Sequence, residues 1–235
     1  MSLRLNLGCG RTTHEEFVNI DFNIFLRFGK IPGLKSLLAR FGVSYPNLDN
    51  VLIHDLRHGI PFAAESADVV YHSHLIEHID YEHVNPFLQE IRRVLKIGGI
   101  QRLVLPDLEH HILQIQDDIG IYEKTGIYNG SALNIHNLLE QSVRRKPAAI
   151  LGLSPIVQRL AIRLFGDAQA RGETHQMMYT KAAIHEILAQ NGFVNIRFVS
   201  KDMSQIPGWQ LMNLDLNPLG SELHEGSIYV ECQRN

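Results

Sequence analysis

The sequence predicts an α/β fold in which helices cover both faces of a mostly parallel, doubly wound sheet of seven strands. Two observations predict this fold: short apolar runs recur along the chain, and amphipathic helical patterns separate several of them. Runs this apolar are typical of strands that are buried on both faces of a parallel sheet. Such sheets bind ligands beyond the carboxyl ends of their strands, where the strand order reverses. We therefore expect the chemistry of this protein at those strand ends.

Seven short apolar runs are predicted to be strands. Three of them end in or beside an acidic residue, namely Asp21, Asp55 and Asp107. Because parallel strands end at the same edge of a sheet, we expect these acids to lie along that edge. The runs cover residues 3–7, 17–21, 50–56, 68–74, 99–107, 193–200 and 227–233.

Two helices are marked by apolar residues at helical spacing. The first is expected to end at Gly98 and Gly99, since glycine commonly terminates a helix. The second is expected to begin after Thr180 as its N-cap and to end at Gly192. Their apolar stripes consist of Val84, Phe87, Leu88, Ile91, Val94 and Leu95 in the first helix and of Ile184, Ile187 and Leu188 in the second.

The composition suits one large globular domain, or one domain that carries insertions. The chain has 235 residues, 45% of them hydrophobic, and a net charge of −3, which gives no reason to expect nucleic acid as a partner. No apolar run reaches the ~18 residues of a membrane span, and residues 1–10 do not resemble a leader peptide. Cys9 and Cys232 lie too far apart in the sequence for a C-x-x-C metal motif. We therefore expect a soluble, reduced, cytoplasmic protein.

A glycine pair follows the first predicted strand, in the sequence NLGCGRTT (residues 6–13). Gly8 and Gly10 allow a tight turn and let a ligand approach the backbone without meeting a Cβ atom. Asp21 ends the second strand, eleven residues after Gly10, where its carboxylate could accept both hydroxyls of a ribose. Asp55 ends the third strand, where it could accept a hydrogen bond from an exocyclic amine such as that of adenine. The three signals in order on consecutive strands indicate a nucleoside-containing ligand.

These motifs and several longer stretches resemble a known family. The chain is similar to class I S-adenosylmethionine-dependent methyltransferases, close to the group with a compact methyltransferase-11-type domain. Together the similar stretches cover about two thirds of the chain. They are LNLGCG for the first motif, VNID for the ribose-binding acid, HDLRHGIPFAAESADVVYHSHLIEHI, EIRRVLKIGGIQRLVLPDLE and MMYTKAAIHEILAQNGFVNIRFV.

The resemblance implies a Rossmann-like fold, a single domain over residues 1–235, and S-adenosylmethionine (AdoMet) as the cofactor. It implies methyl transfer to an oxygen or nitrogen of a small-molecule or glycan-type acceptor. The family usually has an acid at the place of Asn6 and a further glycine at the place of Thr12. Asn6 can still accept a hydrogen bond from the methionine amino group, but it brings no charge. The implied cofactor-binding residues are Asn6, Gly8, Cys9 and Gly10 at the methionine end, Asp21 at the ribose, Asp55 and Leu56 at the adenine, and His72 beside the sulfonium.

Two other functions fit parts of the pattern. A nicotinamide-dependent oxidoreductase is disfavoured, because the dinucleotide fingerprint needs a third glycine, where the chain has Thr13, and an acid ~20 residues further on. A non-catalytic AdoMet-binding module is suggested only by the departures at Asn6 and Thr12.

Residues 72–83, HSHLIEHIDYEH, carry four histidines and two glutamates. His74, Glu77 and His78 spell H-x-x-E-H, the order found in a class of zinc peptidases. That motif needs both histidines on one helix, whereas the fourth predicted strand runs to His72 and leaves such a helix barely started. We therefore expect no metal. Glu77 and His78 could cap local backbone and hydrogen-bond each other.

The alternative is that this turn forms the floor where the methyl donor and the acceptor meet. Methyl transfer depends on orientation, and a hydroxyl acceptor also gains from a nearby base. Histidine suits that role at neutral pH. The candidate catalytic residues are His74, then His78, then Asp107 at the end of the fifth strand.

Two segments, 22–49 and 108–178, exceed what the sheet needs and are expected to be helical cap insertions. They are either amphipathic helices with solvated basic faces or a lid that favours an anionic or lipid-linked acceptor, with peripheral membrane contact. Residues 171–180 precede the last helix and could bring His175 toward the site. By resemblance, such features recur in methyltransferases of cell-surface glycan pathways, which favours a saccharide acceptor. The basic residues of the two segments are Arg27, Lys30, Lys35, Arg40, Arg144, Arg145, Lys146, Arg159 and Arg163.

Overall fold

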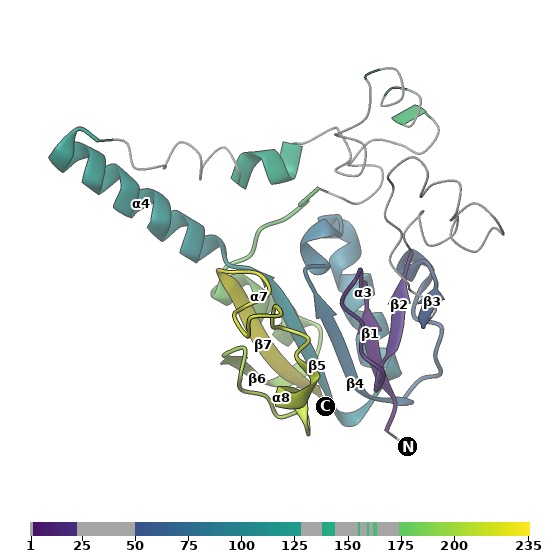
Figure 1. The fold of residues 1–235 in the computed structure, drawn as a ribbon. Helices are drawn as coiled ribbons and strands as arrows, with labels where there is room; N and C mark the ends of the chain where they lie inside the picture. Colours follow the sequence, from purple (N-terminus) through teal and green to yellow (C-terminus); the bar gives the residue numbers. More distant parts are fainter. Residues whose placement is uncertain are drawn as a thin grey trace.

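The computed structural model of the chain describes residues 2–22, 50–127, 138–143, 155, 159, 162–163 and 174–235. Its centre is a seven-stranded sheet in the order β3-β2-β1-β4-β5-β7-β6 (Figure 1). The fold is therefore the seven-stranded, Rossmann-like α/β fold that the sequence predicts. The strands are β1 (Arg4–Leu7), β2 (Val18–Asp21), β3 (Val51–Ile53), β4 (Ala67–Ser73), β5 (Leu95–Pro106), β6 (Phe193–Val199) and β7 (Ser227–Arg234).

The directions and the order of the strands determine where this sheet would bind a ligand. The pairs β1–β2, β2–β3, β1–β4 and β4–β5 are parallel, whereas β7 runs antiparallel to both β5 and β6. The order reverses at β1, because β2 and β3 lie on one side of it and β4 lies on the other. A crevice beyond the carboxyl ends of β1 and β4 is where a sheet of this kind binds ligands.

Two helices pack on one face of the sheet. They are α3 (Tyr81–Val94) and α7 (Lys181–Gln190), and Figure 1 shows both of them behind the strands. Thr180 caps α7 by accepting a hydrogen bond from the Ala183 N–H, as expected. Leu88 and Leu188 are fully buried in the core that these helices form with β1, β4 and β5. The predicted apolar stripes are therefore the faces that bind the sheet.

The end of α3 differs from the prediction. The helix stops at Val94, and Leu95 is already extended and begins β5. Gly98 and Gly99 instead lie in an irregular start of β5, where the register with β4 shifts. A Cβ atom on Gly99 would come within 2.9 Å of the Lys96 carbonyl oxygen, so these glycines serve a strand irregularity rather than a helix end.

The opposite face of the sheet carries a second core, built around Tyr71 and Trp209. Its centre is a buried ion cluster that no local sequence pattern predicted. Arg102 on β5 is 0% exposed, and its guanidinium lies 2.7 Å from Asp215 Oδ2 and 2.8 Å from Glu231 Oε1. The carbon at the centre of the same guanidinium lies 4.6 Å from the centre of the Trp209 ring, and Trp209 is the first residue of the short helix α8 (Trp209–Met212). Arg102 therefore ties the segment before β7 to the sheet.

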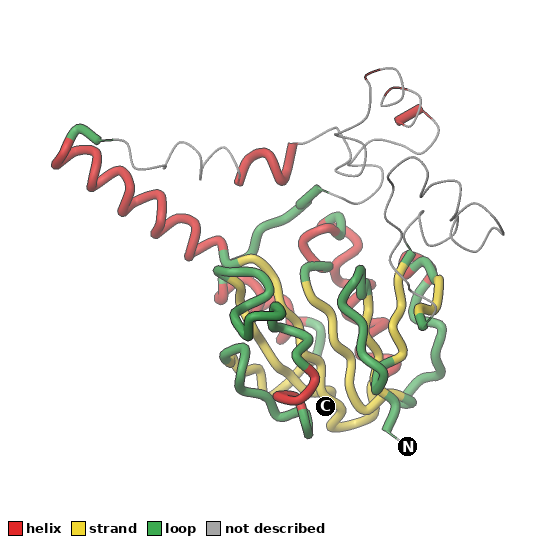
Figure 2. Tube along the Cα trace, in the orientation of Figure 1, coloured by secondary structure: helices red, strands yellow, loops and turns green. Residues whose placement is uncertain are grey.

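A long helix, α4 (Leu108–Thr125), extends away from the sheet (Figures 1 and 2). None of its residues is buried, and it ends at Gly126, whose φ of 67° is left-handed. It opens the predicted insertion 108–178, about half of which lies outside the described residues, as does 22–49 apart from Phe22. Among the described residues, none of the helices is long and apolar enough to cross a membrane.

Candidate active site

The loop after β1 folds against the end of β2. The Cys9 N–H donates to the Ile20 carbonyl at 3.1 Å, and the Gly10 N–H donates to Asp21 Oδ2 at 2.7 Å. Gly8 and Gly10 have φ angles of 61° and 54°, a region that residues with a Cβ atom rarely adopt. The structure thus brings the predicted glycine loop and the predicted ribose-binding acid into direct contact.

The two glycines differ in their surroundings. A Cβ atom on Gly8 would lie 2.7 Å from Leu75 Cδ1, whereas one on Gly10 would meet nothing within 4 Å. Leu75 belongs to the turn that follows β4, so that turn packs directly on the glycine loop. This contact links the end of β4 to the site where AdoMet is expected.

We expect Gly8→Ala to destabilise the protein more than Gly10→Ala. Both variants carry the cost of a left-handed alanine, about 1–2 kcal/mol, but only Gly8→Ala must also displace Leu75. Urea denaturation of the two variants measures the difference. Adding Leu75→Ala should narrow the gap between them, and equal unfolding free energies for the two single variants would contradict the proposed contact.

Asn6 and Cys9 are both buried beside this loop. The Asn6 side chain donates to the Thr12 carbonyl and to Asn19 Oδ1, which joins the end of the loop to β2. Burial, aided by the charge of Asp21, raises the pKa of Cys9 to about 12. The thiol therefore stays protonated at neutral pH and is not a nucleophile.

Asp55 caps the short helix η1 (Leu56–His58), as its strand-end position suggests. Its two carboxylate oxygens pair with the Arg57 guanidinium at 2.7–3.1 Å. The hydrogen bond from Arg57 holds the pKa of Asp55 below its ordinary value. Leu56 is half-buried and packs against the main core. An adenine amine would have to share Asp55 with Arg57.

His72 is fully buried in β4, against the ring of Phe87 from α3. Its Nε2 lies 3.0 Å from Gln101 Nε2, and its Nδ1 has no hydrogen-bond partner. Burial lowers the pKa of His72 to about 4. The structure thus places His72 within the core, below the strand end that carries the other candidate residues.

We expect acid to destabilise the protein through His72. The folded state does not bind this proton until about pH 4, whereas the unfolded chain binds it near pH 6.5. The stability is therefore complete above pH 6.5 and falls by about 3 kcal/mol as the pH drops to 4. Urea unfolding of His72→Gln across this range should show a shallower fall than the wild type.

The exposed His83 offers a matched control, since His83→Gln should keep the wild-type pH dependence. The pKa of His175, which burial and then His78 lower to about 4, acts in the same direction and leaves a residual slope in His72→Gln. An unchanged slope in His72→Gln would contradict the burial of a neutral ring.

A pocket of about 400 Å³ lies at the carboxyl edge of the sheet, between the end of β5 and the start of β7. Its walls include His74, which follows β4, and His175, which precedes α7. The sequence suggested both of these residues. It did not indicate His111, which lies in α4, or His224, which lies in the segment before β7. The histidines that line the pocket are His74, His78, His111, His175 and His224.

Glu77 lies under this pocket, in the short helix η2 (Ile76–His78). It is 0% exposed, and His74 Nδ1 lies 3.1 Å from its Oε1. This is ion-pair distance, yet neither carboxylate oxygen accepts a well-directed hydrogen bond. Burial would raise the pKa of Glu77, but His74 and His78 outweigh that effect and lower it, so Glu77 is an anion.

The histidines of this turn have separate partners. His74 Nε2 lies 3.1 Å from Ser227 Oγ, and its ring lies 4.0 Å from that of His224. His78 Nδ1 lies 3.1 Å from the Thr174 carbonyl oxygen, so His78 does not pair with Glu77 as one interpretation of the sequence supposed. Both rings border the pocket.

Asp107, the third catalytic candidate, is the N-cap of α4. Its Oδ1 accepts hydrogen bonds from the Glu109 and His110 N–H groups. Capping of this kind typically stabilises a helix by about 1 kcal/mol. The cap accounts for the position of Asp107 without a catalytic role.

Comparison with known proteins relates part of the chain to a family. Residues 35–103 match the family model described as a methyltransferase domain, and this segment includes β3, β4, α3 and most of β5. The matched segment is thus similar to a methyltransferase domain, and the seven-stranded sheet has the Rossmann-like fold of class I S-adenosylmethionine-dependent methyltransferases, whose cofactor is AdoMet. Neither finding favours a nicotinamide-dependent oxidoreductase. No curated protein matches the chain.

Solved structures of low identity resemble the chain over its full length. They include a SAM-dependent methyltransferase from Archaeoglobus fulgidus (13% identity, TM-score 0.46, 99% of this chain and 86% of that one). An S-adenosylmethionine-dependent methyltransferase from Mesorhizobium loti has 14% identity and a TM-score of 0.43 over 99% and 90% of the two chains. Geranyl diphosphate C-methyltransferase from Streptomyces coelicolor has 11% identity and a TM-score of 0.42 over 100% and 71%. Because these TM-scores are below 0.5, the three neighbours do not establish the acceptor.

Proposed function

We propose that this enzyme transfers the AdoMet methyl group to an oxygen or nitrogen of a small-molecule or saccharide acceptor in the histidine pocket. One observation carries the proposal: the turn after β4 contacts both sites. Leu75 packs on Gly8 of the glycine loop, and the preceding residue, His74, lines the pocket. An acceptor in the pocket would therefore lie next to the cofactor, as in-line methyl transfer requires.

The glycine loop is the proposed site of the cofactor. The backbone of Gly8, Cys9 and Gly10 would contact the methionine end, beside Asn6. Asp21 would hold the ribose, since it already lies against the Gly10 N–H at the carboxyl end of β2. For the adenine we keep Asp55 and Leu56, and for the sulfonium side His72, as proposals from the sequence.

His74 is the proposed general base. It lies on the pocket wall with one ring nitrogen beside the buried Glu77, and such a carboxylate orients an imidazole and stabilises its protonated form. His78 and Asp107 follow His74 in the order that the sequence suggested: His78 is held at Nδ1 by the Thr174 carbonyl and keeps Nε2, and Asp107 caps α4. An acceptor at His74 would replace Ser227 Oγ at Nε2.

The pocket favours an acceptor of modest size. A volume of about 400 Å³ falls in the usual range for small-molecule sites, roughly 300–1,000 Å³. Imidazole rings can donate to and accept from hydroxyl groups, which suits a sugar. We retain from the sequence the proposals that insertions 22–49 and 108–178 form a cap on a single domain and that the acceptor is anionic or lipid-linked. A cytoplasmic location and peripheral membrane contact also stay proposals.

Thermal unfolding with AdoMet, S-adenosylhomocysteine, NAD and NADP in parallel tests the cofactor. At a hundredfold excess over its dissociation constant a ligand adds about 2.7 kcal/mol, which shifts the melting temperature by roughly 5–10 °C. We expect the shift with the first two compounds alone. Its absence with both would overturn the proposal.

The acceptor class is tested by S-adenosylhomocysteine formation with panels of sugars, other alcohols and amines. Turnover with a hydroxyl or amine acceptor that falls in His74→Gln, while AdoMet binding persists, supports the proposed base. Turnover only with a carbon nucleophile would contradict the acceptor type. AdoMet binding without turnover on any panel would favour the non-catalytic module.

A further inference from the structure

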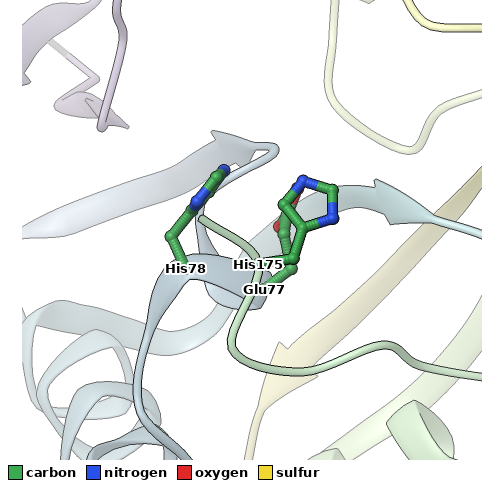
Figure 3. A group of neighbouring side chains, drawn as sticks. All are labelled: Glu77, His78 and His175. Atoms are coloured by element: carbon green, nitrogen blue, oxygen red, sulfur yellow. The ribbon is translucent and has the colours of Figure 1, made fainter. Parts of the chain in front are cut away.

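Three potential metal ligands converge beside the pocket. Glu77, His78 and His175 each present one ligand atom, and these three atoms all lie within 4.8 Å of one another. Two of the residues come from η2, and the third comes from the segment before α7, almost a hundred residues later. Figure 3 shows the His78 and His175 rings on the same side of η2, with the Glu77 carboxylate close behind His175.

The backbone fixes this arrangement. The Gln176 and Met177 N–H groups both donate to the Glu77 carbonyl oxygen, at 2.7 and 3.2 Å. His78 is bonded in return to the carbonyl of Thr174. Because hydrogen bonds on both sides of His175 join the two segments, its ring is held next to Glu77 and His78 rather than brought there by chance.

Two of the groups lack the partners that burial demands. Glu77 is fully buried and neither of its oxygens accepts a well-directed hydrogen bond; Oε1 lies 3.1 Å from His74 Nδ1, whereas Oε2 has no partner among the described residues. The Nδ1 atom of His175 is also buried without a hydrogen-bond partner. Buried charges are normally paired, fully hydrogen-bonded or coordinated to a metal, so the unsatisfied Oε2 beside two imidazole rings suits a metal ligand.

His78, the third group, has its Nε2 atom available for a metal ion. A carbonyl oxygen only accepts hydrogen bonds, so the contact with Thr174 requires the proton of His78 on Nδ1. Nε2 of the neutral ring then carries a free lone pair. Metal-bound histidines are commonly oriented in this way, by donating the other ring N–H to a backbone carbonyl.

We propose that Glu77, His78 and His175 bind a divalent transition-metal ion. Two imidazole nitrogens and one carboxylate suit Zn²⁺, Fe²⁺ or a related borderline ion better than Mg²⁺ or Ca²⁺. Ligand atoms of a tetrahedral zinc site lie about 3.4 Å apart, so the three groups need to approach by no more than about 1.5 Å. Rotation of the half-buried His78 and His175 rings supplies a movement of that size.

This set differs from the H-x-x-E-H pattern in the sequence. That pattern would use His74, which lies instead between Ser227 and the ring of His224. Three protein ligands leave a further coordination position, and the pocket lies beside it. That an oxygen or nitrogen of the acceptor takes this position rests on the proposed function, whereas the metal site itself does not.

The test is a titration of the full chain with Zn²⁺, followed by calorimetry. The protein is purified without a polyhistidine tag and is treated with a chelator beforehand, because the chain has 13 histidines of its own. We expect a single tight equivalent of Zn²⁺. Loss of a ligand in His175→Asn should weaken binding at least tenfold to a hundredfold, the range that loss of even a ligand's supporting hydrogen bond produces.

The matched control is His83→Asn, an exposed histidine on α3 that should leave Zn²⁺ binding unchanged. His78→Asn is a second ligand variant in case His175→Asn does not fold, and the melting curve without metal identifies that case. The proposal is overturned when the wild type binds no tight Zn²⁺, or when both ligand variants bind it as the wild type does. The titration uses neither AdoMet nor an acceptor, so its failure is distinct from a failure of the methyl-transfer proposal.

Discussion

Replacement of Arg102 with methionine is expected to lower the free energy of unfolding by about 3–5 kcal/mol. The side chain is fully buried between two acids, Asp215 and Glu231, which are also buried. Without the guanidinium, both carboxylates stay in the core with no opposite charge. Methionine retains much of the apolar stem, so the loss reflects mainly the charge. Urea denaturation measures it as a lower midpoint.

The control for Arg102→Met lies on a strand of the same sheet. Arg197 on β6 is exposed, so Arg197→Met should change the unfolding free energy by less than about 0.5 kcal/mol. Comparable losses in the two variants would show that the buried cluster contributes nothing beyond an exposed arginine. A variant in which Asp215 and Glu231 are also replaced by apolar residues should recover part of the loss, because no buried charge then remains.

Replacement of Asp21 with asparagine is expected to weaken AdoMet binding about 10- to 100-fold. Hydrogen bonds to charged groups contribute about 1.5–3 kcal/mol, and each 1.4 kcal/mol is tenfold in affinity. Asparagine keeps an acceptor for the Gly10 N–H, so the glycine loop should retain its shape. What it lacks is the negative charge that would face the ribose hydroxyls in the proposed site. Calorimetry with AdoMet measures the change.

Asp68→Asn is the matched control for Asp21→Asn. Asp68 lies near the start of β4, at the opposite edge of the sheet, where it pairs with Lys96 and accepts a hydrogen bond from the Leu3 N–H. Its substitution removes one carboxylate from a strand end but should leave AdoMet affinity unchanged. Equal AdoMet affinity of Asp21→Asn and the wild type would contradict the proposed role of Asp21 in cofactor binding.

The local hydrophobic pattern of the sequence was sufficient to predict the strands of the sheet and the helix α3. Each of the seven apolar runs became a strand, and the stripe that includes Leu88 and Ile91 became the buried face of α3. Both kinds of pattern depend on neighbours within a few residues, because burial of one face fixes the period of a strand or a helix. The end of α3 was wrong, because pairing between β4 and the early start of β5 overrode the usual preference for glycine as a helix terminator.

The glycine loop and its neighbouring acid were also predicted from the sequence. Gly8 and Gly10 follow β1 and Asp21 ends β2, and because β1 and β2 are parallel neighbours, these residues meet at one edge of the sheet. The short spacing between these residues left little freedom for another arrangement.

The strands, the helix stripes and the glycine loop with its acid follow from local sequence, because each depends on residues close together in the chain. The partners of distant polar groups follow from the tertiary fold instead. It placed Arg102 between Asp215 and Glu231, and it brought His175 to Glu77 and His78. The physical reason is that a buried charge can be satisfied by any suitable group that packing brings near it. Which group that is depends on strand order and on the path of the loops, and these are properties of the whole sheet.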